Sequence, residues 1–105
     1  MGAYTSIDSD GLQELLRGSI VLIDVRTDRE IERGLIPGAL HIPLHTLPRR
    51  LQDIGQEFPV VIYCQSGVRS AQACVFLADN GWGQVHNLVG GFGGWAARGL
   101  PVARA

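Results

Sequence analysis

Apolar residues gather in short, nearly continuous runs that are separated by more polar stretches. Two of these runs, residues 20–25 and 59–63, are dominated by valine, isoleucine and leucine. Such runs are typical of strands buried on both faces, as in a parallel sheet. Residues 39–42 and 85–89 are shorter candidates of the same kind. We therefore expect these segments to form the strands of a largely buried sheet.

A short amphipathic pattern precedes the first of these runs. Leu12, Leu15 and Leu16 are spaced so that they share one face of a helix. Asp8 can cap the start of this helix, and Gly18 lies near its expected end. The pattern predicts a helix that covers one face of the sheet.

Further helical patterns follow each of the other runs. The longest covers residues 68–80 and is followed by Gly81, a frequent helix stop. Its predicted core face consists of Ala71, Cys74, Val75 and Ala78. We also expect a helix over residues 47–54 and a turn or brief helix over residues 27–34. Residues 90–95 are expected to form a glycine-rich turn that leads into a short helix.

Strands that alternate with helices over short loops predict an α/β fold of three layers, with a mainly parallel central sheet flanked by helices. The chain has 105 residues, which fits a single domain over residues 1–105. Apolar residues make up 46% and charged residues 18% of the chain, which is enough apolar surface to form a core.

The charge composition excludes several functions. The formal net charge is −1, so neither nucleic acid nor an anionic membrane is an expected partner. All nine basic residues are arginine, which excludes a P-loop lysine and any Schiff-base lysine. No apolar stretch approaches the roughly 20 residues that span a bilayer.

The two cysteines, Cys64 and Cys74, are too few for a disulfide framework and lack C-x-x-C spacing. The histidines have no cysteine or carboxylate beside them at ligand spacing, so no metal site and no cofactor are expected. The N-terminus lacks the basic and apolar segments of a secretory signal. These features favour a cytoplasmic location, where a lone thiol stays reduced.

Cys64 has the most informative position of any polar residue in the chain. It ends the second apolar run, and ligands of open parallel sheets bind at such carboxyl ends of strands. If residues 65–69 curl around the sulfur, their N–H groups and the positive end of the following helix favour an anion and should lower the thiol pKa. Gly67 permits a tight loop, and Arg69 can bind a ligand or brace the loop.

Simpler interpretations apply to some of these residues. A cysteine after a buried strand is usually a small core residue, and Cys64 differs only because Gly67, Arg69 and a helix follow it. Cys74 lies on the predicted core face of its helix and is expected to be structural. The glycines at 90–94 lack a complete G-x-G-x-x-G pattern, so we expect a tight turn packed against the neighbouring loop.

Four linked motifs, in this order and spacing, resemble those of a rhodanese domain. They are Asp-Val-Arg at 24–26 with Glu30, Gly-Leu-Ile-Pro-Gly-Ala at 34–39, Cys-Gln-Ser-Gly-Val-Arg-Ser at 64–70, and Leu-Val-Gly-Gly-Phe-Gly-Gly-Trp at 88–95. The similarity runs from about residue 5 to Pro101 and covers nearly the whole chain. It is closest to the stand-alone, single-domain form of the family.

The resemblance implies a sulfurtransferase that carries sulfur as a persulfide on Cys64. A small donor such as thiosulfate would supply the sulfur, and cyanide, a thiol or a sulfur-relay protein would accept it. The loop expected to bind the persulfide consists of Gln65, Ser66, Gly67, Val68 and Arg69. The residues expected to support this loop are Asp24, Arg26 and Ser70, together with Glu30.

Alternatives remain open at this point. Related phosphatases and arsenate reductases separate their cysteine and arginine by five residues, whereas four residues lie between Cys64 and Arg69. The shorter loop favours sulfur over phosphate. A persulfide relay module and a silent adaptor are further alternatives, although silent members typically lack the cysteine. Neutral Gln65 and Ser66 leave the donor open, and Leu35 replaces the family's usual histidine, for which we expect a change in packing only.

Overall fold

Five short strands and the helices between them make up residues 3–105, the part of the chain described by the structure, a computed structural model. The strands are β1 (Thr5–Ile7), β2 (Val21–Asp24), β3 (Leu40–His41), β4 (Val60–Tyr63) and β5 (Val85–Leu88). The α-helices are α1 (Ser9–Leu15), α2 (Asp28–Ile31), α3 (Val68–Asp79) and α4 (Gly91–Ala97). Two 3-10 helices, η1 (Leu44–Arg49) and η2 (Leu51–Asp53), precede β4.

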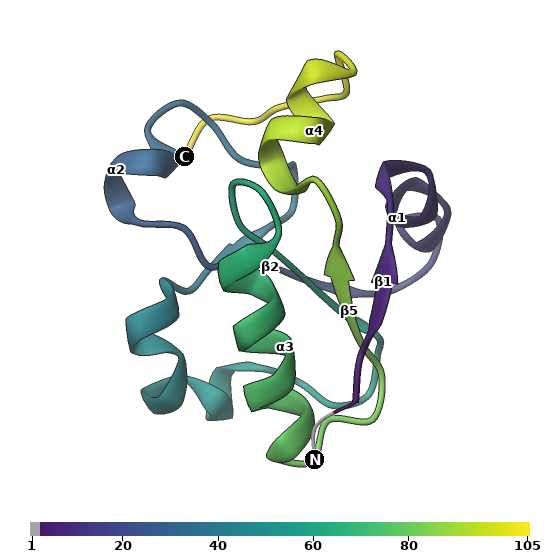
Figure 1. The fold of residues 1–105 in the computed structure, drawn as a ribbon, viewed down its shortest axis with the longest axis vertical. Coiled ribbons are helices and arrows are strands. Elements are labelled where there is room, and N and C mark those ends of the chain that lie inside the picture. The colour runs from purple at the N-terminus through teal and green to yellow at the C-terminus, as the bar shows by residue number, and fades with distance from the viewer. Residues whose placement is uncertain (1–2) are drawn as a thin grey trace.

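The strands form one parallel sheet in the order β1-β5-β4-β2-β3. Asp24, the last residue of β2, lies opposite Tyr63, the last residue of β4. The carboxyl ends of the strands therefore meet at one edge of the sheet. Figure 1 shows the β4–α3 loop, α2 and the start of α4 gathered at this edge, in the upper half of the view. Residues distant in sequence are thus brought beside Cys64.

Helices cover both faces of the sheet and form two apolar cores. Val60 and Ile62 belong to the core on the side of α3 and the 3-10 helices. Val61 and Tyr63 belong to the core on the side of α1 and α4. Successive strand residues point to opposite faces, so both faces of β4 are buried. This arrangement confirms the predicted three-layer α/β fold.

One local expectation was wrong, and one strand was not foreseen. The single helix expected for residues 47–54 is instead two 3-10 helices, with Pro48 inside the first. Proline has no N–H to donate and disfavours a longer α-helix at this point. Strand β1 was not expected, because it has three residues and pairs only with β5, at an edge of the sheet. Such a short, largely polar strand has no apolar run to reveal it.

The buried face of α3 also differs from the expected one. Its buried residues are Ser70, Ala73, Cys74 and Leu77, whereas Val75 is 37% exposed. The helix packs against β4 and β5 on one side and η1 on another, which rotates the buried face away from Val75. Within residues 3–105, none of the helices has the length and apolar character that crossing a membrane requires.

Candidate active site at the Cys64 loop

Cys64 lies directly after β4, with its side chain almost completely buried at 1% exposure. The backbone turns back on itself at Gly67, whose N–H donates to the Cys64 Sγ at 3.1 Å. Gly67 has a φ of 113°, which residues with a side chain rarely adopt. Helix α3 begins at the next residue. The structure therefore places a backbone donor and a helix start at the sulfur, as the sequence predicted.

The surroundings of Cys64 lower the pKa of its thiol. Burial alone raises the pKa, but the Ser70 hydroxyl and the backbone N–H groups of Ser70, Gly67 and Ser66 together outweigh it. For Cys74, burial raises the pKa and the nearby Cys64 raises it further, to about 12. Only one of the two cysteines is thus poised to react as a thiolate.

The buried Ser70 adds a side-chain donor at the sulfur, and the buried Asn87 contacts both Ser70 and the loop backbone. The Ser70 Oγ lies 3.4 Å from the Cys64 Sγ and 2.5 Å from the Asn87 Oδ1. Asn87 in turn donates through its Nδ2 to the carbonyl oxygen of Gly67 at 3.1 Å. Ser70 was predicted as loop support, but Asn87 was not. Its signal in the sequence is an amide side chain inside a strand that is otherwise largely apolar.

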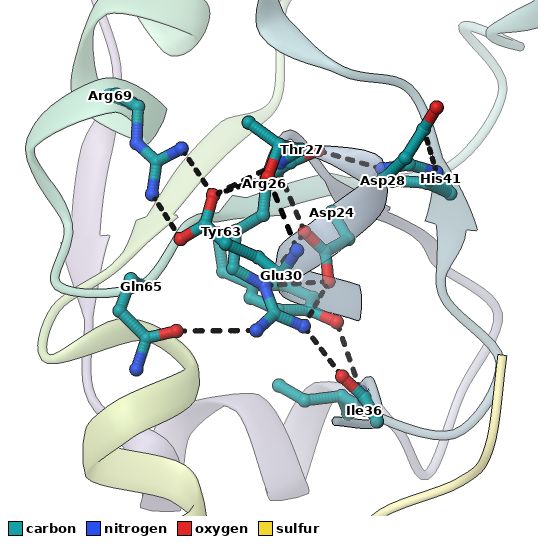
Figure 2. A network of polar contacts seen from close by, with 11 residues as sticks. Asp24, Arg26, Thr27, Asp28, Glu30, Ile36, His41, Tyr63, Gln65 and Arg69 are labelled. Atoms are coloured by element: carbon teal, nitrogen blue, oxygen red, sulfur yellow. Dashed lines mark hydrogen bonds and ion pairs between the residues drawn. The ribbon is translucent and has the colours of Figure 1, made fainter. Parts of the chain in front are cut away.

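Arg69 forms an ion pair with Glu30. Its two terminal nitrogens donate to the two carboxylate oxygens of Glu30 at 2.7 and 2.8 Å (Figure 2). This contact lowers the pKa of Glu30 to about 2, against a smaller opposing effect of burial. Glu30 also forms a capping box with Thr27 at the start of α2. Arg69 therefore braces the loop against α2, the second of the two roles that the sequence left open.

Asp24 and Arg26 form a buried ion pair beneath the loop. The guanidinium of Arg26 donates to both carboxylate oxygens of Asp24 at 2.9–3.1 Å, and both side chains are at most 1% exposed. Arg26 also donates to the carbonyl oxygen of Gly34 and, as Figure 2 shows, to the Gln65 Oε1 at 3.2 Å. The predicted loop support is therefore direct for Arg26, whereas Asp24 acts on the loop through Arg26.

The glycine-rich turn at the start of α4 packs against the Cys64 loop. The N–H of Phe92 donates to the Cys64 carbonyl oxygen at 2.8 Å, and the N–H of Gly93 donates to the Gln65 carbonyl oxygen at 3.0 Å. A Cβ on Gly91 would come within 2.8 Å of the Gln65 backbone, which leaves no room for a side chain. This confirms the expected tight turn against the neighbouring loop.

Leu35, which stands where the family usually has a histidine, pairs with the C-terminal segment. It is buried, and its backbone pairs with Ala103 through two hydrogen bonds of 2.9 and 2.8 Å. Its role in the structure is thus to hold the C-terminal segment. Among residues 3–105, no three His, Cys, Asp or Glu side chains are grouped so that they could bind a metal ion.

A cavity of about 470 Å³ opens beside the loop, between α2 and the start of α4. Gln65 and Phe92 line it on the side of the loop. The other residues of its wall are Arg26, Thr27, Arg29, Glu30 and Arg33.

Fold and site together define an α/β protein that holds a cysteine of lowered pKa at the carboxyl edge of a parallel sheet. The family model of the rhodanese-like domain matches residues 8–98. The chain therefore belongs to the rhodanese-like domain family, as its motifs indicated.

Relatives and solved structures agree with this assignment. A sulfurtransferase of Allochromatium vinosum is 47% identical over 98 residues, which cover 91% of this chain and 92% of the relative. The thiosulfate sulfurtransferase GlpE of Actinobacillus pleuropneumoniae is 31% identical, with 97% and 95% covered. The crystal structure of a rhodanese-like domain protein from Staphylococcus aureus superposes with a TM-score of 0.83, at 37% identity and with 94% and 98% covered. These similarities support a sulfurtransferase role.

Proposed function

We propose that the chain transfers sulfane sulfur through a persulfide on Cys64. The observation that carries this proposal is the set of donors around the Cys64 Sγ, which lowers the thiol pKa although the side chain is buried. The thiolate is the form of a cysteine that attacks sulfur, and a lowered pKa increases the thiolate fraction at a given pH. Membership of the rhodanese-like family and the similarity to sulfurtransferases support the same reaction.

The first half-reaction loads the cysteine. With thiosulfate as donor, the Cys64 thiolate attacks the outer sulfur, a new S–S bond forms, and the S–S bond of thiosulfate breaks. Sulfite leaves with the electron pair of that bond, and Cys64 becomes a persulfide anion. The role we assign to Gln65, Ser66, Gly67, Val68 and Arg69 is to surround this anion with backbone N–H groups.

The second half-reaction returns the enzyme to its thiolate. A thiolate or cyanide attacks the outer sulfur of the persulfide, and the S–S bond to Cys64 breaks with its electron pair on the Cys64 sulfur. No oxidant or reductant is needed, because each S–S bond that breaks is replaced by a new bond to the transferred sulfur. We assign Asp24, Arg26 and Ser70 to holding the loop in position throughout, since the donors must not move as charge returns to the cysteine.

Intact-mass measurement after incubation with thiosulfate tests the proposal. The wild-type chain should gain the mass of one sulfur atom and lose it on addition of cyanide. Cys64→Ser should gain nothing, whereas the matched control Cys74→Ala should behave like wild type. A chain that gains no sulfur from thiosulfate, mercaptopyruvate or an organic persulfide would overturn the proposal.

The phosphatase alternative is tested with the same variants. Four residues separate Cys64 from Arg69, and both terminal nitrogens of the Arg69 guanidinium are engaged by Glu30. We therefore expect no hydrolysis of an aryl phosphate. Hydrolysis that is present in the wild type and absent in Cys64→Ser would revive the phosphatase.

A further inference from the structure

Two arginines beside the Cys64 loop take no part in the ion pairs and hydrogen bonds that hold it. Arg29 and Arg33 lie four residues apart and both line the cavity between α2 and α4. Within the described part of the chain, neither guanidinium has an ion-pair or hydrogen-bond partner. Both residues are exposed, so their charges are accessible to a ligand.

The remaining charges around the cavity are already matched. The Arg26 guanidinium is paired with the buried carboxylate of Asp24. The Glu30 carboxylate, the one acidic side chain of the wall, is paired with Arg69. Both pairs are neutral, so the wall carries the two unmatched positive charges of Arg29 and Arg33. An anion is the ligand that these charges favour.

The Cys64 loop forms part of the cavity wall. Gln65, which follows Cys64 directly, is part of this wall and is fixed by Arg26. Phe92 forms another part, and its N–H holds the Cys64 carbonyl oxygen. The Arg26 guanidinium lies over the Phe92 ring, 4.1 Å from its centroid, which gives the wall a rigid and partly apolar surface. A ligand in this cavity therefore contacts Gln65, the residue that follows the reacting cysteine.

The volume of the cavity favours an organic anion over a small inorganic one. A volume of about 470 Å³ lies within the range of about 300–1,000 Å³ that is usual for small organic ligands. Cyanide and thiosulfate need much less space than this. We propose that the cavity binds the carboxylates of an organic thiol or its persulfide through Arg29 and Arg33, while the sulfur of the ligand reaches Cys64. This site rests on the proposed sulfur transfer, for which it supplies the substrate class.

The transfer itself keeps atoms and electrons balanced. The thiolate of the bound organic thiol attacks the outer sulfur of the Cys64 persulfide. The S–S bond to Cys64 breaks with its electrons on the Cys64 sulfur, and the organic persulfide leaves the cavity. The carboxylates stay with Arg29 and Arg33 during the step, so these two arginines determine specificity and take no part in bond making.

Binding of S-methylglutathione tests the site without any sulfur transfer. This thioether has two carboxylates and cannot react with Cys64. In an NMR titration of the wild-type chain, we expect shifts at the backbone amides of α2, Gln65 and Phe92. The double variant Arg29→Gln, Arg33→Gln should raise the Kd about tenfold, since each partly solvated charge pair accounts for a factor of about three to five. The matched control is Arg49→Gln, because Arg49 is an exposed arginine on η1 that lies outside the cavity wall. This variant should leave the Kd unchanged.

A second measurement connects the site to transfer. Persulfide-loaded protein is mixed with glutathione or with its uncharged-carboxyl analogue, glutathione diethyl ester, and the loss of sulfur is followed by intact mass. The ratio of the two rate constants should fall about tenfold in the double variant and stay constant in Arg49→Gln. The proposed site alone would be overturned if the double variant transferred sulfur with the same ratio of rate constants as the wild type. It would also be overturned if the double variant bound S-methylglutathione with an unchanged Kd. Binding that depends on both arginines in a chain that never forms a persulfide would instead overturn the proposed function.

Discussion

Replacing Ser70 with alanine removes the one side-chain donor to the Cys64 sulfur among residues 3–105. The hydroxyl has a single proton and two acceptors, the Sγ at 3.4 Å and the Asn87 Oδ1 at 2.5 Å. When Cys64 is a thiolate, its charge makes the sulfur the stronger competitor for that proton. Ser70 is completely buried, so its hydrogen bond acts in surroundings with little solvent screening. Ser70→Ala should therefore raise the pKa of Cys64.

The size of the effect follows from the hydrogen bond that is lost. Hydrogen bonds to charged groups contribute about 1.5–3 kcal/mol, and about 1.4 kcal/mol corresponds to a tenfold change in an equilibrium. Below the titration midpoint, the thiolate fraction should thus fall at least about tenfold. The nucleophilicity of a thiolate rises with its basicity, with a Brønsted slope of about 0.4–0.5. The observed rate should therefore fall roughly threefold below the midpoint and rise roughly threefold on the high-pH plateau.

The pH dependence of alkylation by iodoacetamide measures both effects. Cys74 does not interfere, because it is buried and its pKa is raised to about 12. The matched control is Ser66→Ala, which keeps the backbone N–H of Ser66 and should leave the profile unchanged. Thermal unfolding of each variant shows whether it is folded. A folded Ser70→Ala protein whose profile coincides with that of the wild type would refute the role of the hydroxyl.

Two further predictions concern the ion pairs that hold the loop. Asp24→Asn leaves the buried Arg26 charge unpaired and should lower the free energy of unfolding in urea by about 3–5 kcal/mol, whereas the exposed control Asp28→Asn should change it by less than about 0.5 kcal/mol. A loss in Asp24→Asn no larger than the control's would contradict the buried pair. Glu30 has a pKa lowered from 4.5 to about 2, so its contact with Arg69 stabilises the folded chain fully above pH 4.5 and is lost as the pH falls toward 2. Urea unfolding of wild type and Glu30→Gln should differ at pH 6 and converge near pH 2, and a difference independent of pH would rule out this carboxylate as its source.

Burial on both faces explains why much of the fold was predictable. Apart from Asp24, the residues of strands β2 and β4 are apolar and mostly buried, so these strands stand out in the sequence as nearly continuous runs. β1 lies at the sheet edge and has no buried residue in its span. Its place is set by the backbone partners that β5 offers, from Thr5 opposite His86 to Ile7 opposite Leu88. Such pairing is a long-range property that local pattern does not contain.

The same distinction separates the predictable and unpredictable parts of the site. The turn at Gly67 and the helix start beside Cys64 depend on neighbours in sequence, and the order of residue types was sufficient to predict them. The contact of Arg69 with Glu30 joins residues 39 positions apart, and its choice over a bound ligand depends on where α2 lies. Asn87 reaches the loop from β5, 20 positions beyond Gly67, for the same reason.

The distribution of charge around Cys64 explains how the loop and the cavity divide their tasks. Neutral groups, the Ser70 hydroxyl and the backbone N–H groups, lower the pKa of the sulfur, while the nearest arginine charges are matched by Asp24 and Glu30. Dipoles of this kind favour any anion of suitable size and do not distinguish one sulfur donor from another. In the proposed site, discrimination comes from charges that the fold leaves unmatched, and among the described residues of the cavity wall these are Arg29 and Arg33. Arg29 and Arg33 would thus recognise a carboxylate of the substrate several atoms away from its sulfur. The Cys64 loop would then need to bind only the sulfur that is transferred.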